Sequence, residues 1–165
     1  MGMGNNAGQV DHVVMMCRAE NLVAATERLE QMLEIEFQYF EAPRQGLRGS
    51  LSLESGLEFI APLGDDSAMS NSLTRLIEEK GEGIHSITFG VADADATKAR
   101  LDRQGFKARE PYEAVNEDAP AFMHENFTTT KEVHMRERVA GTLFVLSEIE
   151  KRDSEVSSVK EAGQR

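Results

Sequence analysis

Residues 10–17 read VDHVVMMC and residues 83–91 read GIHSITFGV, and these two stretches establish the architecture of the chain. Both are short runs of apolar and β-branched residues, which is typical of buried strands. The segment HVVMMC at residues 12–17 aligns with SITFGV at residues 86–91, and a helical pattern follows each of them. An internal repeat of this kind predicts two copies of one structural unit.

The first unit covers residues 9–62 and has the order strand, helix and three further strands. Apolar residues at helical spacing follow the opening strand and predict one amphipathic helix. Alternation of apolar and polar residues then predicts the remaining strands. These elements are a helix at 22–33 and strands at 35–40, 47–53 and 57–61.

The second unit covers residues 83–149 and repeats this order after a connecting helix at residues 66–80. Two open half-sheets that join at their first strands can curl into one cup. We therefore predict an α+β fold in which two βαβββ modules form a curved, cup-shaped mixed sheet with helices on the outside. The predicted elements are a helix at 93–104, a strand from 106, a long loop at 113–128 and strands at 131–138 and 141–149.

The ends of the chain differ in composition from this single domain, residues 9–149. Residues 1–8 are polar and rich in glycine, and we expect an unstructured lead, native or introduced by cloning. Residues 150–165 are polar and charged, and we expect a loose tail. No stretch approaches the roughly 18 apolar residues of a membrane span, and no apolar signal region opens the chain.

The charge balance indicates which partners the protein avoids. Lysine and arginine number 18 against 29 acidic residues, so the net charge is −11. Such a surface repels nucleic acid and anionic membranes, which leaves a small molecule as the expected ligand. The only cysteine, Cys17, lies in an apolar run and cannot form an internal disulfide. A reducing, cytoplasmic location fits this composition.

Four motifs, in this order, resemble the vicinal oxygen chelate superfamily, which includes glyoxalase I, bleomycin-resistance proteins, extradiol dioxygenases and methylmalonyl-CoA epimerase. They are DHVVMM, LEFIAPLGDDS, KGEGIHSITFGV and GTLFVL. The segment APLGDDS…KGEGIH is similar to the middle of the epimerase branch. The resemblance covers roughly residues 9–149 and implies the same cup, with its ligand site inside.

The resemblance also implies a divalent metal ion held by one residue from each of four strands. The first two positions match His12 and Glu58, whereas Ser86 and Val145 stand where the family has a histidine and a glutamate. Because firm sites usually have at least three protein ligands, we expect at most a weakly held Zn, Ni, Co or Mn ion. By strand alternation, the neighbouring His85 should point away from the cup.

His12 and Glu58 are the candidate catalytic acid and base, since a buried carboxylate and a neutral imidazole can share a proton near neutral pH. Each also has an ordinary interpretation, because a strand histidine is often a core residue and Glu58 fits an edge strand facing water. The candidate substrate-binding residues are His134 and Arg136, which would steady an oxyanion, and Ser50, Ser52, Ser86 and Thr88, which would line the cup.

The resemblance implies a glyoxalase-like lyase or isomerase of the epimerase type. It would act on a small oxygen-rich acid or thioester by abstracting a proton next to a carbonyl. The alternative is a non-catalytic protein of the bleomycin-resistance type that binds a small molecule or antibiotic. The missing metal ligands favour this alternative, whereas an aromatic content of 6% without tryptophan disfavours it. A homodimer is expected, as in the drug-binding relatives, and the sequence does not identify the substrate.

Overall fold

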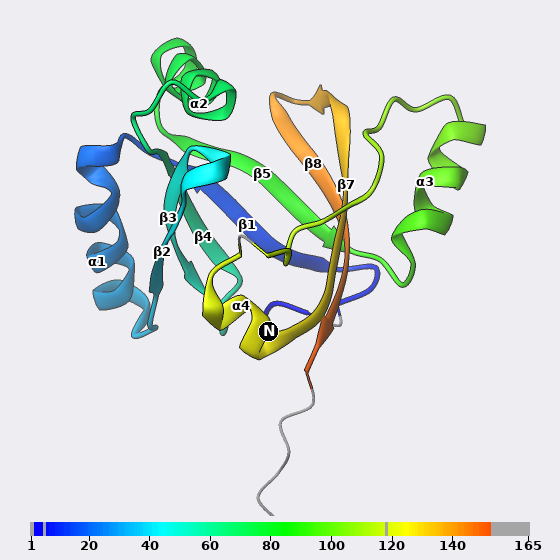
Figure 1. Cartoon of the computed structure of the whole chain (residues 1–165), viewed down its shortest axis with the longest axis horizontal. Coiled ribbons are helices and arrows are strands. Elements are labelled where there is room, and N and C mark those ends of the chain that lie inside the picture. Colours follow the sequence, from blue (N-terminus) through cyan, green and yellow to red (C-terminus); the bar gives the residue numbers. More distant parts are fainter. Residues whose placement is uncertain (1, 5, 118, 153–165) are drawn as a thin grey trace, which may run out of the picture.

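The computed structural model describes residues 2–4, 6–117 and 119–152, which form one curved eight-stranded sheet with helices around it (Figure 1). The sheet order is β2-β3-β4-β1-β5-β8-β7-β6. The strands are β1 (Val10–Met16), β2 (Gln38–Ala42), β3 (Leu47–Ser52), β4 (Leu57–Pro62), β5 (Gly83–Gly90), β6 (Tyr112–Glu113), β7 (Phe127–Val139) and β8 (Thr142–Lys151). The helices are α1 (Leu22–Leu33), α2 (Ala68–Lys80), α3 (Ala94–Arg103) and α4 (Ala121–Asn126), with short 3₁₀ turns at Ala19–Asn21 and Pro43–Gln45.

The sheet is symmetric about its two central strands, as the internal repeat predicted. β1 pairs with β5 antiparallel. On either side, β1 pairs with β4 and β5 pairs with β8, both parallel. The prediction of a curved α+β sheet built from two strand–helix–strand units is confirmed.

Helices α1 and α3 cover the outer face of the sheet and so leave the other face free to form the cup. α1 packs on the first half through a cluster that includes Cys17, Leu22 and Phe59. α3 packs on the second half through Leu101 and Val133. These two helices flank the sheet on opposite sides of Figure 1. Burial of these apolar side chains stabilises the curvature by removing them from water.

The other two helices, α2 and α4, lie at the rim of the cup. α2 packs on β4 and contributes Leu73 and Ile77 to a cluster with Met16 of β1. α4 falls within the predicted loop at 113–128 and brings Phe122 to 6.4 Å from Phe40, measured between ring centroids. A helix of six residues is too short for its periodicity to be recognised in the sequence.

The N-terminal segment is ordered where the structure describes it, so the prediction of an unstructured lead is wrong there. Met3 is buried, and its backbone N–H donates to the carbonyl of Leu53. Gly8 donates to the carbonyl of Gly90 in β5. At the other end β8 continues to Lys151, and residues 153–165 of the predicted tail lie outside the described residues. Among the described residues no helix is both long and apolar enough to cross a membrane.

Two β-bulges interrupt the pairing of the central strands. Between the pairs Val10–Phe89 and His12–Thr88, β1 has one extra residue, Asp11. A second bulge lies between the pairs Val14–Ser86 and Met15–Ile84, where β5 has one extra residue, His85. Because a bulge turns the extra side chain away from strict alternation, His85 leaves the outer face that the sequence pattern assigns to it and lies on the cup side.

Candidate active site in the cup

A cavity of about 860 Å³ occupies the inside of the cup, within the size range of small-molecule sites. Three of the four histidines of the chain line it, one from each of three strands: His12, His85 and His134. Glu58 and Ser86 also lie on the lining, and α2 and α4 contribute to its rim. The predicted residues His12, Glu58, Ser86, His134 and Arg136 are therefore brought together around one cavity, whereas His124 is exposed on α4.

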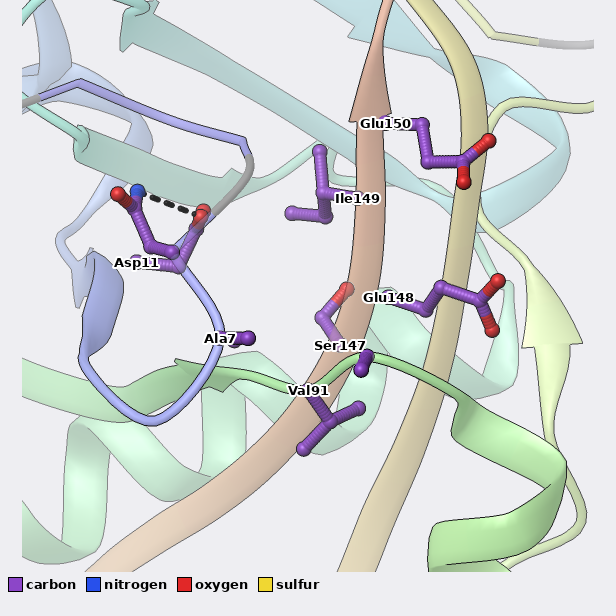
Figure 2. A pocket seen from close by; sticks show the side chains of 10 residues that line it. Ala7, Asp11, Val91, Ser147, Glu148, Ile149 and Glu150 are labelled. Atoms are coloured by element: carbon purple, nitrogen blue, oxygen red, sulfur yellow. Dashed lines mark hydrogen bonds between the residues drawn. The ribbon is translucent and has the colours of Figure 1, made fainter.

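His12 is fixed by the neighbouring carboxylate of Asp11. The Nδ1 atom lies 2.9 Å from Oδ1 of Asp11, and both side chains are buried. The backbone N–H of Gly4 and the amide of Asn6 donate to the other carboxylate oxygen, at 2.8 and 2.9 Å. Asp11 faces a separate pocket of about 160 Å³ beside β8 (Figure 2). This arrangement places the imidazole proton on Nδ1 and leaves a lone pair on Nε2 for the cavity.

Burial, hydrogen bonds and nearby charges shift the pKa values of both Asp11 and His12. Burial opposes ionisation of Asp11, but hydrogen bonds from His12, Gly4 and Asn6 hold its pKa below the usual value. Burial also disfavours the imidazolium, yet the hydrogen bond to Asp11 and the negative charge of Glu58 raise the pKa of His12. A histidine in this setting is a stronger base than one free in water.

Glu58 is the second ionisable group on the floor of the cavity. Burial raises the pKa of its carboxyl to about 7, while the nearby His12 opposes this rise and Glu132 adds to it. A carboxyl with this pKa exists in both protonation states near neutral pH, which suits it to giving and taking a proton.

The raised pKa of Glu58 predicts a specific dependence of stability on pH. Because the folded-state pKa lies above the usual value of 4.5, the unfolded chain ionises first as the pH rises, and the protein loses stability between about pH 4.5 and 7. Glu58→Gln should remove this loss and be more stable than wild type at pH 8 by up to roughly 3 kcal/mol, with a much smaller difference at pH 4.5. Urea unfolding at both pH values measures this difference.

The matched control is Glu54→Gln, because Glu54 is exposed in the turn between β3 and β4. This variant should retain the wild-type dependence on pH. If Glu58→Gln shows the same dependence as the control, the carboxyl of Glu58 is not desolvated and its proposed role in proton transfer fails.

A second polar cluster, on β6 and β7, was not recognised in the sequence. Oε2 of Glu132 accepts hydrogen bonds from Nε2 of His134 and from the hydroxyl of Tyr112, each at 2.9 Å. Burial opposes ionisation of Glu132, but the hydrogen bond from His134 keeps its pKa below the usual value. Glu132 lies two residues before His134 and therefore on the same face of the strand. Strand alternation could thus have predicted that Glu132 accompanies His134 in the site.

The prediction that His85 points away from the cup is wrong, because the bulge in β5 places it on the cavity lining. Its Nδ1 atom lies 3.3 Å from the hydroxyl of Ser86. Burial lowers the pKa of His85 to about 4, and the positive charge of Arg138 contributes. His85 is therefore a neutral polar group of the site near neutral pH.

Ser50 and Ser52 do not line the cavity, so their predicted role in binding is wrong. The hydroxyl of Ser50 lies 2.7 Å from that of Thr26 in α1, on the outer face of the sheet. Leu47 and Leu51 occupy the cup face of β3 in their place. Thr88 is buried and also lies off the lining, and its hydroxyl has no partner among the described residues.

The donors on the lining do not fit a firm metal centre. Ser86 offers a hydroxyl at one family position, and Val145 offers a buried apolar side chain at the other. Val145 pairs across the strands with His134, whose imidazole is bonded to Glu132. Within the described part of the chain no three His, Cys, Asp or Glu side chains gather as a ligand set. The weakly held ion stays a prediction.

The fold and the cavity define a cup-shaped protein of the paired βαβββ class. The model of the Glyoxalase/Bleomycin resistance protein/Dioxygenase superfamily matches residues 11–122, more than half of the chain. The chain therefore belongs to this superfamily.

Solved structures of methylmalonyl-CoA epimerases have a similar fold. The epimerase of Streptomyces coelicolor, in complex with 2-nitronate-propionyl-CoA, is 22% identical with a TM-score of 0.64 over 85% of this chain and 96% of that chain. The Mycobacterium tuberculosis enzyme is 20% identical with a TM-score of 0.65 over 90% and 92%. A hypothetical protein of Bacillus halodurans C-125 is 19% identical with a TM-score of 0.65 over 95% and 98%. A search of the curated proteins found no match.

Proposed function

We propose that the protein is an epimerase-type isomerase or lyase that moves a proton next to the carbonyl of a small acid or thioester. The observation that carries this proposal is the floor of the cavity. There an Asp11-oriented imidazole lies near Glu58, whose pKa is about 7. Structural neighbours that bind CoA compounds support a thioester as one form of the substrate.

In the proposed reaction, Nε2 of His12 or the carboxylate of Glu58 takes the proton from the carbon next to the carbonyl. The carbonyl oxygen then gains negative charge, and preorganised donors that face this charge lower the barrier. The guanidinium of Arg136 supplies such donors from the opposite wall. The hydroxyl of Tyr112 and Nε2 of His134 already donate to Glu132 and hold that carboxylate beside it. Return of a proton to either face of the carbon completes an epimerisation.

Proton exchange with solvent tests this function. The protein is incubated in D₂O with a panel of 2-substituted acids and their CoA thioesters, including methylmalonyl-CoA, and deuterium incorporation is followed by mass spectrometry. We expect exchange in at least one compound, and we expect it to persist after dialysis against a mild chelator, since the acid and base belong to the chain.

The second candidate is a binding protein without chemistry, favoured by the absence of a three-ligand set among the described residues. Tight binding of panel compounds without any exchange would establish this alternative and reject the enzyme. We also propose that the protein works as a cytoplasmic homodimer. Light scattering of the purified protein measures its mass in solution and so tests the homodimer.

A further inference from the structure

The lining of the cup is divided chemically between its two halves. The first half and α2 contribute a wall that is mainly apolar, including Val14, Leu47, Leu51, Ile60, Met69 and Leu76. All of the arginines on the lining come from the second half: Arg109, Arg136 and Arg138. The first half contributes no lysine or arginine to the lining formed by the described residues. The cavity therefore has one apolar side and one cationic side.

Arg136 and Arg138 follow His134 at two-residue intervals on β7, so alternation places them on the same face of the strand. His134 pairs with Val145 and Arg138 pairs with Leu143, so β7 spans four residues where β8 spans two. Strict alternation is lost there, so Met135 also reaches the lining, between His134 and Arg136.

The chain before β6 then adds Arg109 beside this irregular stretch. The backbone N–H of Arg109 donates to the carbonyl of His134, and that of Arg136 donates to the carbonyl of Lys107, both at 2.8 Å. Ala108 forms a bridge with Met135 between these two bonds. The two arginines are thus held on paired backbone segments at one side of the cavity.

These guanidinium groups have no protein carboxylate to neutralise them. Among the described residues the ion pairs involve other cations, and none joins Arg109 or Arg136. The nearby Glu132 carboxylate accepts from His134 and Tyr112. In a chain with a net charge of −11, two neighbouring arginines without an acidic partner beside a cavity favour an anionic ligand.

We propose that the cup binds a carboxylate that carries a hydrocarbon chain. The carboxylate lies at Arg109 and Arg136, and the chain lies along the apolar wall formed by β1, β3, β4 and α2. The inference rests on the proposed function in placing the substrate in this cavity, and it adds the class of substrate. Each methylene that leaves water for this wall should tighten binding about fourfold, so affinity should rise with chain length.

Isothermal titration calorimetry with three probes measures separately what the carboxylate and the hydrocarbon chain contribute to affinity. Octanoate carries both the charge and the chain, octanol carries the chain alone, and acetate carries the charge alone. We expect octanoate to bind most tightly. In the double variant Arg109→Gln/Arg136→Gln, octanoate should bind roughly 10- to 100-fold more weakly, because a hydrogen bond between charged groups is lost. The affinity for octanol should not change, because octanol has no carboxylate.

Two further variants serve as controls. Arg103→Gln removes an equivalent charge from α3 on the outer face and should leave all affinities unchanged. Met69→Ser alters the apolar wall at a half-exposed position on α2, where the fold tolerates it, and should weaken octanoate and octanol alike by about tenfold.

Equal affinity of octanoate and octanol for the wild type would overturn the inference, as would an equal effect of the double variant and Arg103→Gln. Failure of octanoate to bind would overturn it as well, even if proton exchange is found with another acid. Octanoate binding that depends on both arginines, without exchange in any compound, would support the ligand class and reject the proposed enzyme.

Discussion

Replacing His12 with alanine is expected to slow deuterium exchange by about 10²–10⁴-fold, the contribution of a positioned general base. The variant loses the imidazole whose tautomer is fixed by Asp11, and water that fills the space has no comparable basicity. Ligand affinity should change far less, because the arginines and the apolar wall remain. The exchange rate at saturating substrate and the dissociation constant from titration measure the two effects separately.

His124→Ala is the matched control, since His124 is exposed on α4 and does not line the cavity. It should exchange deuterium at the wild-type rate. Equal rates in the two variants would show that His12 is a buried structural residue, and the proposed site would then have to be abandoned.

Replacing Phe127 with alanine is expected to lower the free energy of unfolding by about 3–5 kcal/mol, the range for a fully buried aromatic side chain. Phe127 begins β7 and is 1% exposed. It packs in a cluster with Met3, Leu51 and Ile149, which draws on the N-terminal segment and both halves of the sheet. Urea denaturation followed by circular dichroism measures the loss.

Phe106→Ala provides the comparison, because the side chain of Phe106 is 50% exposed. This variant should lower the free energy of unfolding by no more than about 0.5 kcal/mol, as for most surface substitutions. A similar cost for both variants would mean that the cluster around Phe127 is not a tightly packed part of the core.

Much of the fold could be predicted because it depends on patterns within single segments. Period-two alternation indicated the strands, and the likeness of residues 12–17 to 86–91 indicated the paired units. The parts that were missed depend on contacts between distant segments. α4 is too short to show a period, and Met3 is one apolar residue in a polar stretch whose burial depends on β3 and β8.

Which residues line the cavity was predicted where strand alternation holds and was missed where a bulge interrupts it. His12, Glu58 and Ser86 lie on the lining as alternation and the family motifs indicated. His85 was misplaced because a bulge arises from pairing with another strand, and one strand's sequence does not reveal it. On β3 the pattern of apolar and small residues was assigned to the wrong faces. Ser50 and Ser52 were expected on the cup face, but Ser50 contacts Thr26 of α1, because alternation defines two faces of a strand without telling which of them faces the cup.

The N-terminal contacts of Asp11 have a practical consequence for handling the protein. Gly4 and Asn6 supply two of the hydrogen bonds that hold this carboxylate, and the carboxylate in turn orients His12. A purification tag joined directly before this segment, or trimming of the first residues by a protease, therefore alters the environment of His12, the proposed base. Expression designs that leave residues 2–8 intact and place the tag at the other terminus avoid this interference.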